Sequence, residues 1–200
     1  MRKAARIVAA VLGFLAGLAG LEHGISEILQ GNAQPVGLMF PSMGPPCNPA
    51  QAWNACEPAV SVVPNFLVAG TLTVLLSLAL LLWSAAFIQH PRSGTALILL
   101  SVALLAFGGG VFPPLLGIAG GVAGTQIHKP LAGKPGAITR LAAKLWPWPL
   151  VILIVWLLGQ FPLGYFFNDL LKSIIVWGLL LIVVSLPLSI WVGYAHDAAS

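Results

Sequence analysis

Long apolar runs, separated by shorter polar segments, make up most of the chain. The predicted membrane spans are residues 7–29, 62–88, 94–112, 148–166 and 173–194. As helices, runs of this length reach about 30 Å, the thickness of the hydrocarbon core of a bilayer. The sequence therefore predicts an all-α, polytopic transmembrane helix bundle, with residues 1–200 forming a single integral membrane domain.

A sixth apolar run, residues 113–127, is too short to cross a membrane alone, because its helix would be only about 22 Å long. It follows the sequence Gly-Gly-Gly-Val-Phe-Pro-Pro, which ends at Pro114. Glycine supplies backbone freedom and proline cannot continue a helix, so Gly109, Gly110, Pro113 and Pro114 are predicted to form a hinge. We expect residues 94–127 to be a hairpin of one full span and one half-span. One continuous helix would be about 51 Å long and would overshoot the bilayer.

The positions of the charged residues give an orientation. Lys and Arg are enriched in the cytoplasmic loops of membrane proteins. If both termini are cytoplasmic and residues 94–127 cross out and return, every Lys and Arg except Lys172 lies inside. The outer loop, residues 30–61, then contains no Lys or Arg, and the connector 128–147 is the basic inner segment. A single crossing would place this connector outside, so the charge pattern favours the hairpin.

Composition agrees with a membrane location. Hydrophobic residues make up 58% of the chain and charged residues only 7%, against about 25% charged in ordinary soluble domains. The net charge of +4 comes from cations at the ends of apolar runs, without a basic patch interleaved with aromatic residues, so a nucleic-acid partner is not expected. The expected partners are membrane lipids, with a homo-oligomer or a larger membrane complex left open, in a prokaryotic plasma (inner) membrane.

The first apolar run has two interpretations. Arg2, Lys3 and Arg6 followed by an apolar segment resemble the start of a secretory signal peptide. The apolar run, however, continues through Ile28 and Leu29, which makes it long enough to span. A retained first transmembrane helix is therefore favoured over a cleaved signal.

The basic connector contains a helical pattern. Its apolar positions are Ile138, Leu141, Ala142 and Leu145, with the cations displaced to another face. This spacing predicts a short amphipathic helix at the level of the lipid headgroups. A basic loop anchored by the following tryptophans is the alternative.

Ionisable residues collect near the end of the first span. Ionisable groups inside a membrane are costly and are candidates for function by default. At 100° per residue, Glu27 continues a stripe of small residues that predicts close helix packing, and His23 lies beside it, four residues away and within reach of a hydrogen bond. Glu22 points to nearly the opposite side. The stripe is formed by Gly13, Gly17, Gly20 and Gly24.

Further polar residues fall at the same outer level of the predicted topology. Asn65 begins the second span, Gln160 lies in the outer half of the fourth, and Tyr165 and Asp169 occupy the next turn. The candidate site is one outward-facing polar cavity, closed by the tip of the hairpin. Its predicted lining residues are Glu22, His23, Glu27, Asn65, Gln160, Tyr165 and Asp169.

Several functions fit this cluster. A carboxylate and an imidazole can relay protons or couple ion movement, and they can act as acid and base on a lipid or quinone. No metal site is predicted, because one His and two Glu on one helix do not complete a ligand set, and no cofactor or catalytic residue is identified. In the alternative interpretation the cluster has no functional role: it is the end of a helix at the membrane interface, where the Glu and His side chains hydrogen-bond to neighbouring backbone. The leading hypothesis is transport or proton-coupled movement, followed by a membrane enzyme and by a structural subunit of a membrane complex.

Cys47 and Cys56, the only cysteines, fall in the predicted outer loop. On the oxidising side of a membrane, such a pair predicts a structural disulfide. A redox-active pair is disfavoured, because no Cys-x-x-Cys motif is present.

Overall fold

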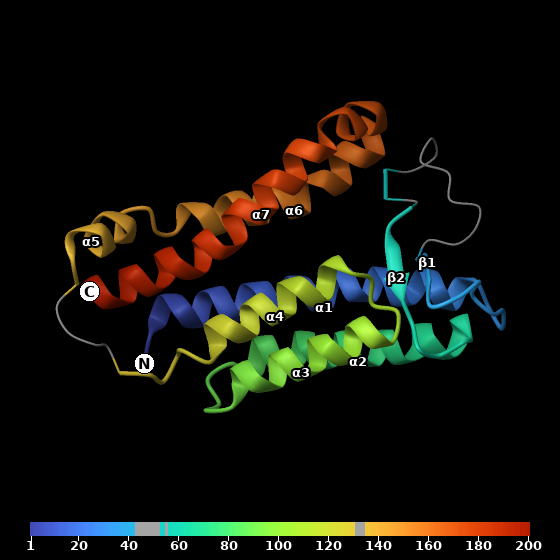
Figure 1. Ribbon diagram of the computed structural model, residues 1–200, viewed down its shortest axis with the longest axis horizontal. Helices are drawn as coiled ribbons and strands as arrows, with labels where there is room; N and C mark the ends of the chain where they lie inside the picture. The colour runs from blue at the N-terminus through green and yellow to red at the C-terminus, as the bar shows by residue number, and fades with distance from the viewer. Residues whose placement is uncertain (43–52, 55, 131–134) are drawn as a thin grey trace.

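The computed structural model describes residues 1–42, 53–54, 56–130 and 135–200. Within these residues the protein is helical apart from one small antiparallel sheet, as the apolar pattern predicted (Figure 1). The helices are α1 Lys3–Leu29, α2 Phe66–Ala86, α3 Ser93–Ala106, α4 Phe112–Gly124, α5 Ala137–Ala143, α6 Trp148–Phe166 and α7 Asn168–Ala199. The strands are β1 Met39–Pro41 and β2 Pro58–Val60.

Four helices are long and apolar enough to cross a membrane: α1 with 27 residues, α2 with 21, α6 with 19 and α7 with 32. The prediction of five full spans and one half-span is not confirmed. The predicted third span, residues 94–112, is replaced by the 14 residues of α3, and the half-span is the 13-residue helix α4. Both arms of the hairpin are therefore short, because α3 ends before the glycines and does not continue through them.

The glycine segment ends α3 with a local capping motif. The Gly109 N–H donates to the Leu104 carbonyl at 2.9 Å, and Gly108 adopts a φ of 108°. This is the hydrogen bond of a Schellman motif, in which a residue with positive φ, usually glycine, follows the helix. Pro113 and Pro114 then occupy the first turn of α4, where proline is tolerated because the N–H groups have no partner in the helix.

The chain reverses direction between α3 and α4, as the glycine and proline residues predicted. The two helices meet at their far ends, where Gly94 lies so close to Gly121 and Thr125 that a Cβ atom would not fit. This contact makes α3 and α4 an antiparallel hairpin.

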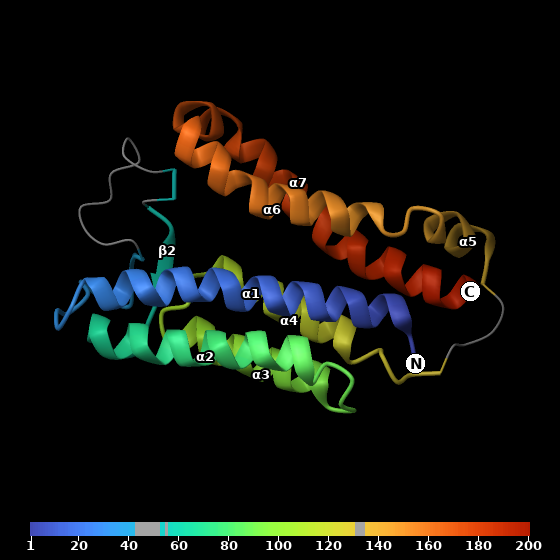
Figure 2. The ribbon, with the colours of Figure 1, turned by 180° about the vertical axis from the view of Figure 1, so that it is seen from behind.

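Helix α1 lies at the centre of the molecule and contacts α2, α4 and α7 (Figure 2). The predicted glycine stripe faces α2: a Cβ atom on Gly17 would lie 2.8 Å from the Ser77 carbonyl oxygen, and one on Gly24 would lie 3.0 Å from the Gly70 carbonyl oxygen. Small residues on this face allow the two helix backbones to approach closely.

Helices α6 and α7 form a pair that is attached to the rest of the bundle mainly at one end. There, Asp197 accepts hydrogen bonds from the N–H groups of Ala4 and Ala5, and the Tyr194 hydroxyl donates to the Val122 carbonyl. Both termini lie at this end (Figure 1). Toward the other end the pair diverges from α1 and α4. Three hydrogen bonds thus tie the pair to α1 and α4 at one end, and a wedge-shaped space remains at the other.

The outer faces of this pair are strongly apolar. On α7, Val176, Trp177 and Val183 are 62%, 71% and 68% exposed. An apolar face of this size is typical of a surface in contact with lipid. The exposed apolar side chains therefore support a membrane location, as the lengths of the four apolar helices also do.

The two loops are partly described. The connector contains α5, which confirms a short helix at the predicted position and packs against α7. Ile138 and Leu141 are exposed, whereas Ala142 is buried. In the predicted outer loop, β1 and β2 pair in antiparallel register with Phe40 opposite Ala59. The predicted Cys47–Cys56 disulfide lies outside the described residues, because residues 43–52 are not described.

Candidate functional site

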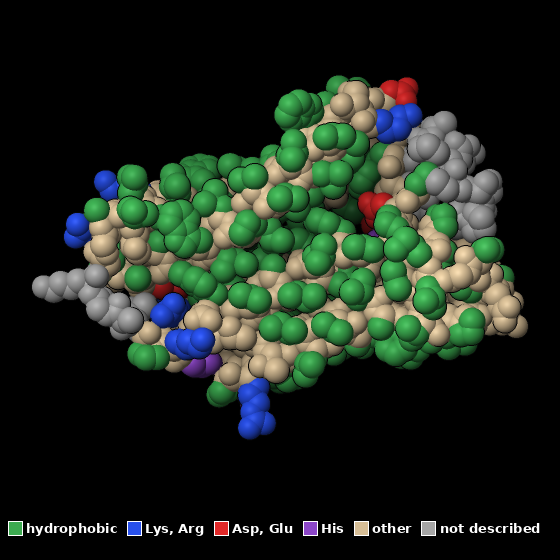
Figure 3. All heavy atoms as spheres, viewed as in Figure 1, with side chains coloured by type: hydrophobic (Ala, Val, Ile, Leu, Met, Phe, Trp, Pro, Cys, Tyr) green, Lys and Arg blue, Asp and Glu red, His purple; other side chains and the backbone are tan. Residues whose placement is uncertain are grey.

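A cleft opens where the α6–α7 pair diverges from α1 and α4. It has two adjoining lobes of about 410 and 390 Å³, which share His23, Trp53, Glu57, Phe112 and Gln160. The first lobe lies between α1 and α6 and the second between α4 and α7. In Figure 3 the cleft is a hollow walled by hydrophobic side chains, with acidic and histidine atoms at its base.

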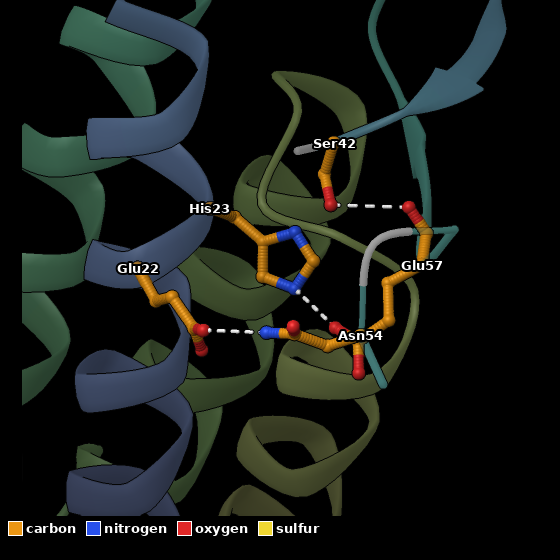
Figure 4. Close-up of polar contacts among 5 residues, drawn as sticks. All are labelled: Glu22, His23, Ser42, Asn54 and Glu57. Atoms are coloured by element: carbon orange, nitrogen blue, oxygen red, sulfur yellow. Dashed lines mark hydrogen bonds and ion pairs between the residues drawn. The ribbon is translucent and has the colours of Figure 1, made fainter. Parts of the chain in front are cut away.

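Two polar pairs form the base of the cleft (Figure 4). The His23 Nε2 atom lies 3.3 Å from the Glu57 Oε2 atom, and the Asn54 amide donates to Glu22 Oε1 at 2.9 Å. His23 is buried, whereas Glu57 retains 35% of its side-chain exposure. The cleft therefore presents a carboxylate to its interior and holds an imidazole directly behind it, an arrangement that can accept a hydrogen bond, bind a cation or transfer a proton.

The small sheet positions Glu57. This residue immediately precedes β2, and its backbone carbonyl accepts hydrogen bonds from both the N–H and the hydroxyl of Ser42, which follows β1. Strand pairing thus fixes the backbone of Glu57 opposite α1. The side chain can then reach His23 across the gap between the loop and the helix.

Trp53 connects the same loop to α6. Its indole lies against Gly164, where any larger residue would overlap it, and its ring centroid is 6.1 Å from that of Phe161 in an edge-to-face arrangement. The indole therefore forms a wall of both lobes. It also closes part of the space between the loop and α6.

Glu27 is fully buried next to the cleft but is not part of its lining. Neither of its carboxyl oxygens has a hydrogen-bond partner among the described residues, and Gly108 lies directly against them. The hydrogen bond between His23 and Glu27 that their spacing would allow is not formed. The reason is geometric: the His23 ring is turned toward Glu57, and its Nδ1 atom is buried without a described partner.

The glycine segment covers both buried groups. Gly110, with a φ of 73°, lies against the His23 ring, while Gly108 lies against Glu27. A Cβ atom on either glycine would overlap the side chain below it. Of the two glycines in the predicted hinge, Gly110 contacts His23, whereas Gly109 lies against Leu104. Gly108, which contacts Glu27, was not part of that prediction.

The structure brings together only some of the residues predicted to line one cavity. Glu22, His23 and Gln160 line the cleft, together with Pro113 at the start of α4. The others lie elsewhere. Asn65 caps α2 and donates to Asn32, Tyr165 is 84% exposed, and Asp169 pairs with Lys172 at 2.7 Å on the surface. Glu27 is buried beneath Gly108 and does not line the cleft.

Sequence reasoning missed the contribution of the loop. Trp53 and Glu57 line the cleft, and Asn54 donates a hydrogen bond to Glu22 at its base, although no helical periodicity marks these three residues. One signal was present: Glu57 is the only acidic residue in residues 30–61, a segment without Lys or Arg. An isolated charge in such a loop indicates a partner elsewhere in the chain, and that partner is His23.

Among the described residues, no three His, Cys, Asp or Glu side chains are placed to hold a metal ion. No protein-family model, curated protein or solved structure matches the chain. The function is therefore argued from the chemistry of the site itself.

Proposed function

We propose that this protein transports a small solute across the membrane through the cleft, and that Glu27 carries the proton to which the movement is coupled. The observation that carries the proposal is a fully buried carboxyl group without a described partner, directly beneath Gly108 and four residues along α1 from His23, which lines the cleft. Ionisable groups in this position inside helix bundles mark proton and ion pathways.

The burial of Glu27 limits its charge state. An ionised carboxylate without a partner in an apolar interior costs several kcal/mol, whereas the protonated acid does not. We therefore infer that Glu27 is protonated while Gly108 covers its carboxyl group. Releasing the proton requires water or a partner group to reach the carboxyl, which in turn requires the covering glycines to move.

The glycine segment is suited to this movement. Gly108 and Gly110 stand between two short helices and directly over Glu27 and His23. Broken helices near the middle of a membrane are the elements with which many transporters build their binding sites. A displacement of the α3–α4 hairpin would uncover both ionisable groups together, which links the protonation of Glu27 to the opening of the cleft.

The proposal includes an orientation. The cleft faces outward and the end that carries both termini is cytoplasmic, in agreement with the positions of Lys and Arg. We expect Lys144→Cys, in a background without the native cysteines, to react with a membrane-impermeant maleimide only after the cells are permeabilised. Labelling of intact cells at this position would contradict the orientation.

Replacing Glu27 by glutamine is expected to abolish coupled transport. The amide has the size of the acid but cannot release a proton, so solute-driven proton movement should fall at least about tenfold. The assay uses liposomes containing the purified protein and a pH-sensitive dye. Amino acids, sugars, organic cations and short-chain lipids are added in turn.

Asp169→Asn is the matched control, because it removes one carboxylate at a surface position outside the cleft. Proton movement with at least one solute should be retained in this variant and lost in Glu27→Gln. Equal rates in the two variants would contradict the role of Glu27. No movement with any solute in the unsubstituted protein would contradict transport itself.

A membrane enzyme acting on a lipid or quinone is the second candidate. The His23–Glu57 pair favours it, because an imidazole next to a carboxylate at the base of an apolar cleft can act as acid and base. Chemical conversion of an added lipid or quinone, lost in His23→Gln and independent of a proton gradient, would support the enzyme over the transporter.

A further inference from the structure

We propose that the cleft binds lipophilic organic cations, molecules with one positive charge surrounded by aromatic or aliphatic groups. This inference rests on the proposed transport function for its physiological meaning. The binding that it predicts is measured without transport, so the two ideas can fail separately.

Charge is the first argument. Glu22 and Glu57 converge on the base of the cleft, and no Lys or Arg is present among the described residues that line either lobe. Their described polar contacts are Asn54, a neutral amide, and His23. Two carboxyl groups therefore face the same space, and the only basic side chain described beside them is the His23 imidazole. A positively charged ligand would reduce the repulsion between the two carboxylates.

Aromatic side chains are the second argument. Trp53, Phe112 and Phe161 all line the first lobe. The faces of aromatic rings attract cations, most strongly in the case of tryptophan, and the attraction grows when water is excluded. Carboxylates at the base and aromatic rings on the walls together favour an organic cation over a hydrated inorganic ion.

The shape and polarity of the space are the third argument. A volume of about 410 Å³ falls within the range of small-molecule sites, roughly 300–1,000 Å³. Apart from Gln160 the remaining walls are apolar, and through Leu15, Leu18 and Leu158 they continue into a mostly apolar groove of about 600 Å³ along α1. This groove is also lined by Arg6, Ser84 and Gln89. This groove gives the apolar part of a ligand a place to lie and a route from the membrane.

An unpartnered polar atom at the same place points to a ligand independently. The His23 ring lines both lobes, its side chain is only 3% exposed, and its Nδ1 atom has no hydrogen-bond partner among the described residues. Buried polar atoms are normally satisfied. A neutral imidazole can therefore complete its hydrogen bonding with a water molecule or with a polar group of the bound molecule.

The test is the binding of tetraphenylphosphonium to the purified full-length protein in detergent, measured by equilibrium dialysis. We expect saturable binding that is weakened about tenfold by Glu22→Gln and again by Glu57→Gln, since each substitution removes one attractive charge. Asp169→Asn should bind like the unsubstituted protein. The glutamine side chain keeps an acceptor for Asn54, so the polar pair at position 22 is preserved.

Tetraphenylborate is the decisive comparison, because it has the same shape and the opposite charge and requires no substitution. It should show no saturable binding. Equal binding of the two ions, or full tetraphenylphosphonium affinity in the variant with both glutamine substitutions, would overturn the proposal. Binding of the cation without any solute-driven proton movement would leave this inference standing and contradict transport. Transport of a neutral solute without binding of the cation would support transport and contradict this inference.

Discussion

Replacing Asp197 by alanine is expected to lower the free energy of unfolding by about 2–4 kcal/mol. The Asp197 carboxylate is 5% exposed and accepts hydrogen bonds of 2.9 Å from both Ala4 N–H and Ala5 N–H. Helix α1 has no side-chain cap of its own at Arg2. The last helix therefore supplies the cap of the first, and its loss leaves two buried N–H groups without an acceptor. Equilibrium unfolding in mixed detergent micelles measures the change.

Asp197→Asn provides a graded comparison. The amide keeps one acceptor oxygen but loses the negative charge that interacts favourably with the N-terminus of a helix, so a smaller loss of about 1–2 kcal/mol is expected. Asp169→Asn, at an exposed position, should change the stability little. If Asp197→Ala unfolds at the same detergent composition as Asp169→Asn, the cap does not hold the two ends of the chain together.

Gly108→Ala should be the second strongly destabilising substitution, with an expected loss of about 2–4 kcal/mol. Two effects add at this position. A φ of 108° is unfavourable for any residue with a side chain, and the new methyl group would overlap the Glu27 carboxyl group. Since that carboxyl is fully buried, it has no solvent-exposed space to move into. Thermal unfolding in detergent is a suitable measurement.

Two other glycines separate the contributions. Gly31 has a φ of 72° with nothing within 4 Å of an added Cβ atom, so Gly31→Ala reports backbone strain alone, about 1 kcal/mol. Gly159 lies inside α6 with open space around it, and Gly159→Ala should be neutral or slightly stabilising. If Gly108→Ala costs no more than Gly31→Ala, the contact with Glu27 contributes nothing to stability.

The helices were predictable to different extents. Apolar length located α1, α2, α6 and α7, and α6 matches its predicted range, because a run of apolar residues in lipid has no alternative to the helix. The third span was predicted too long. Residues 107–111 are apolar enough to extend α3, but Gly108 satisfies the end of that helix with a positive φ. A hydropathy pattern contains no information about such a cap, so it cannot predict where α3 ends.

The candidate site was predictable only on the side of α1. Helical geometry placed Glu27 on the glycine face and His23 beside it, and both are buried. The same geometry suggested a bond between them, although His23 instead pairs with Glu57 from a loop. That partner is 34 residues further along the chain, and no local pattern determines such a contact.

The sequence by itself determined that the protein is helical and apolar enough for a membrane, that its chain turns back at the glycine and proline residues, and which face of α1 packs closely. These properties depend on neighbours within a few positions. Tertiary structure alone decided that Glu57 and Trp53 reach the cleft, that Asp197 caps α1, and that Asn65, Tyr165 and Asp169 stay outside. Those contacts join segments that are distant in the sequence, and no pattern within a few positions determines them.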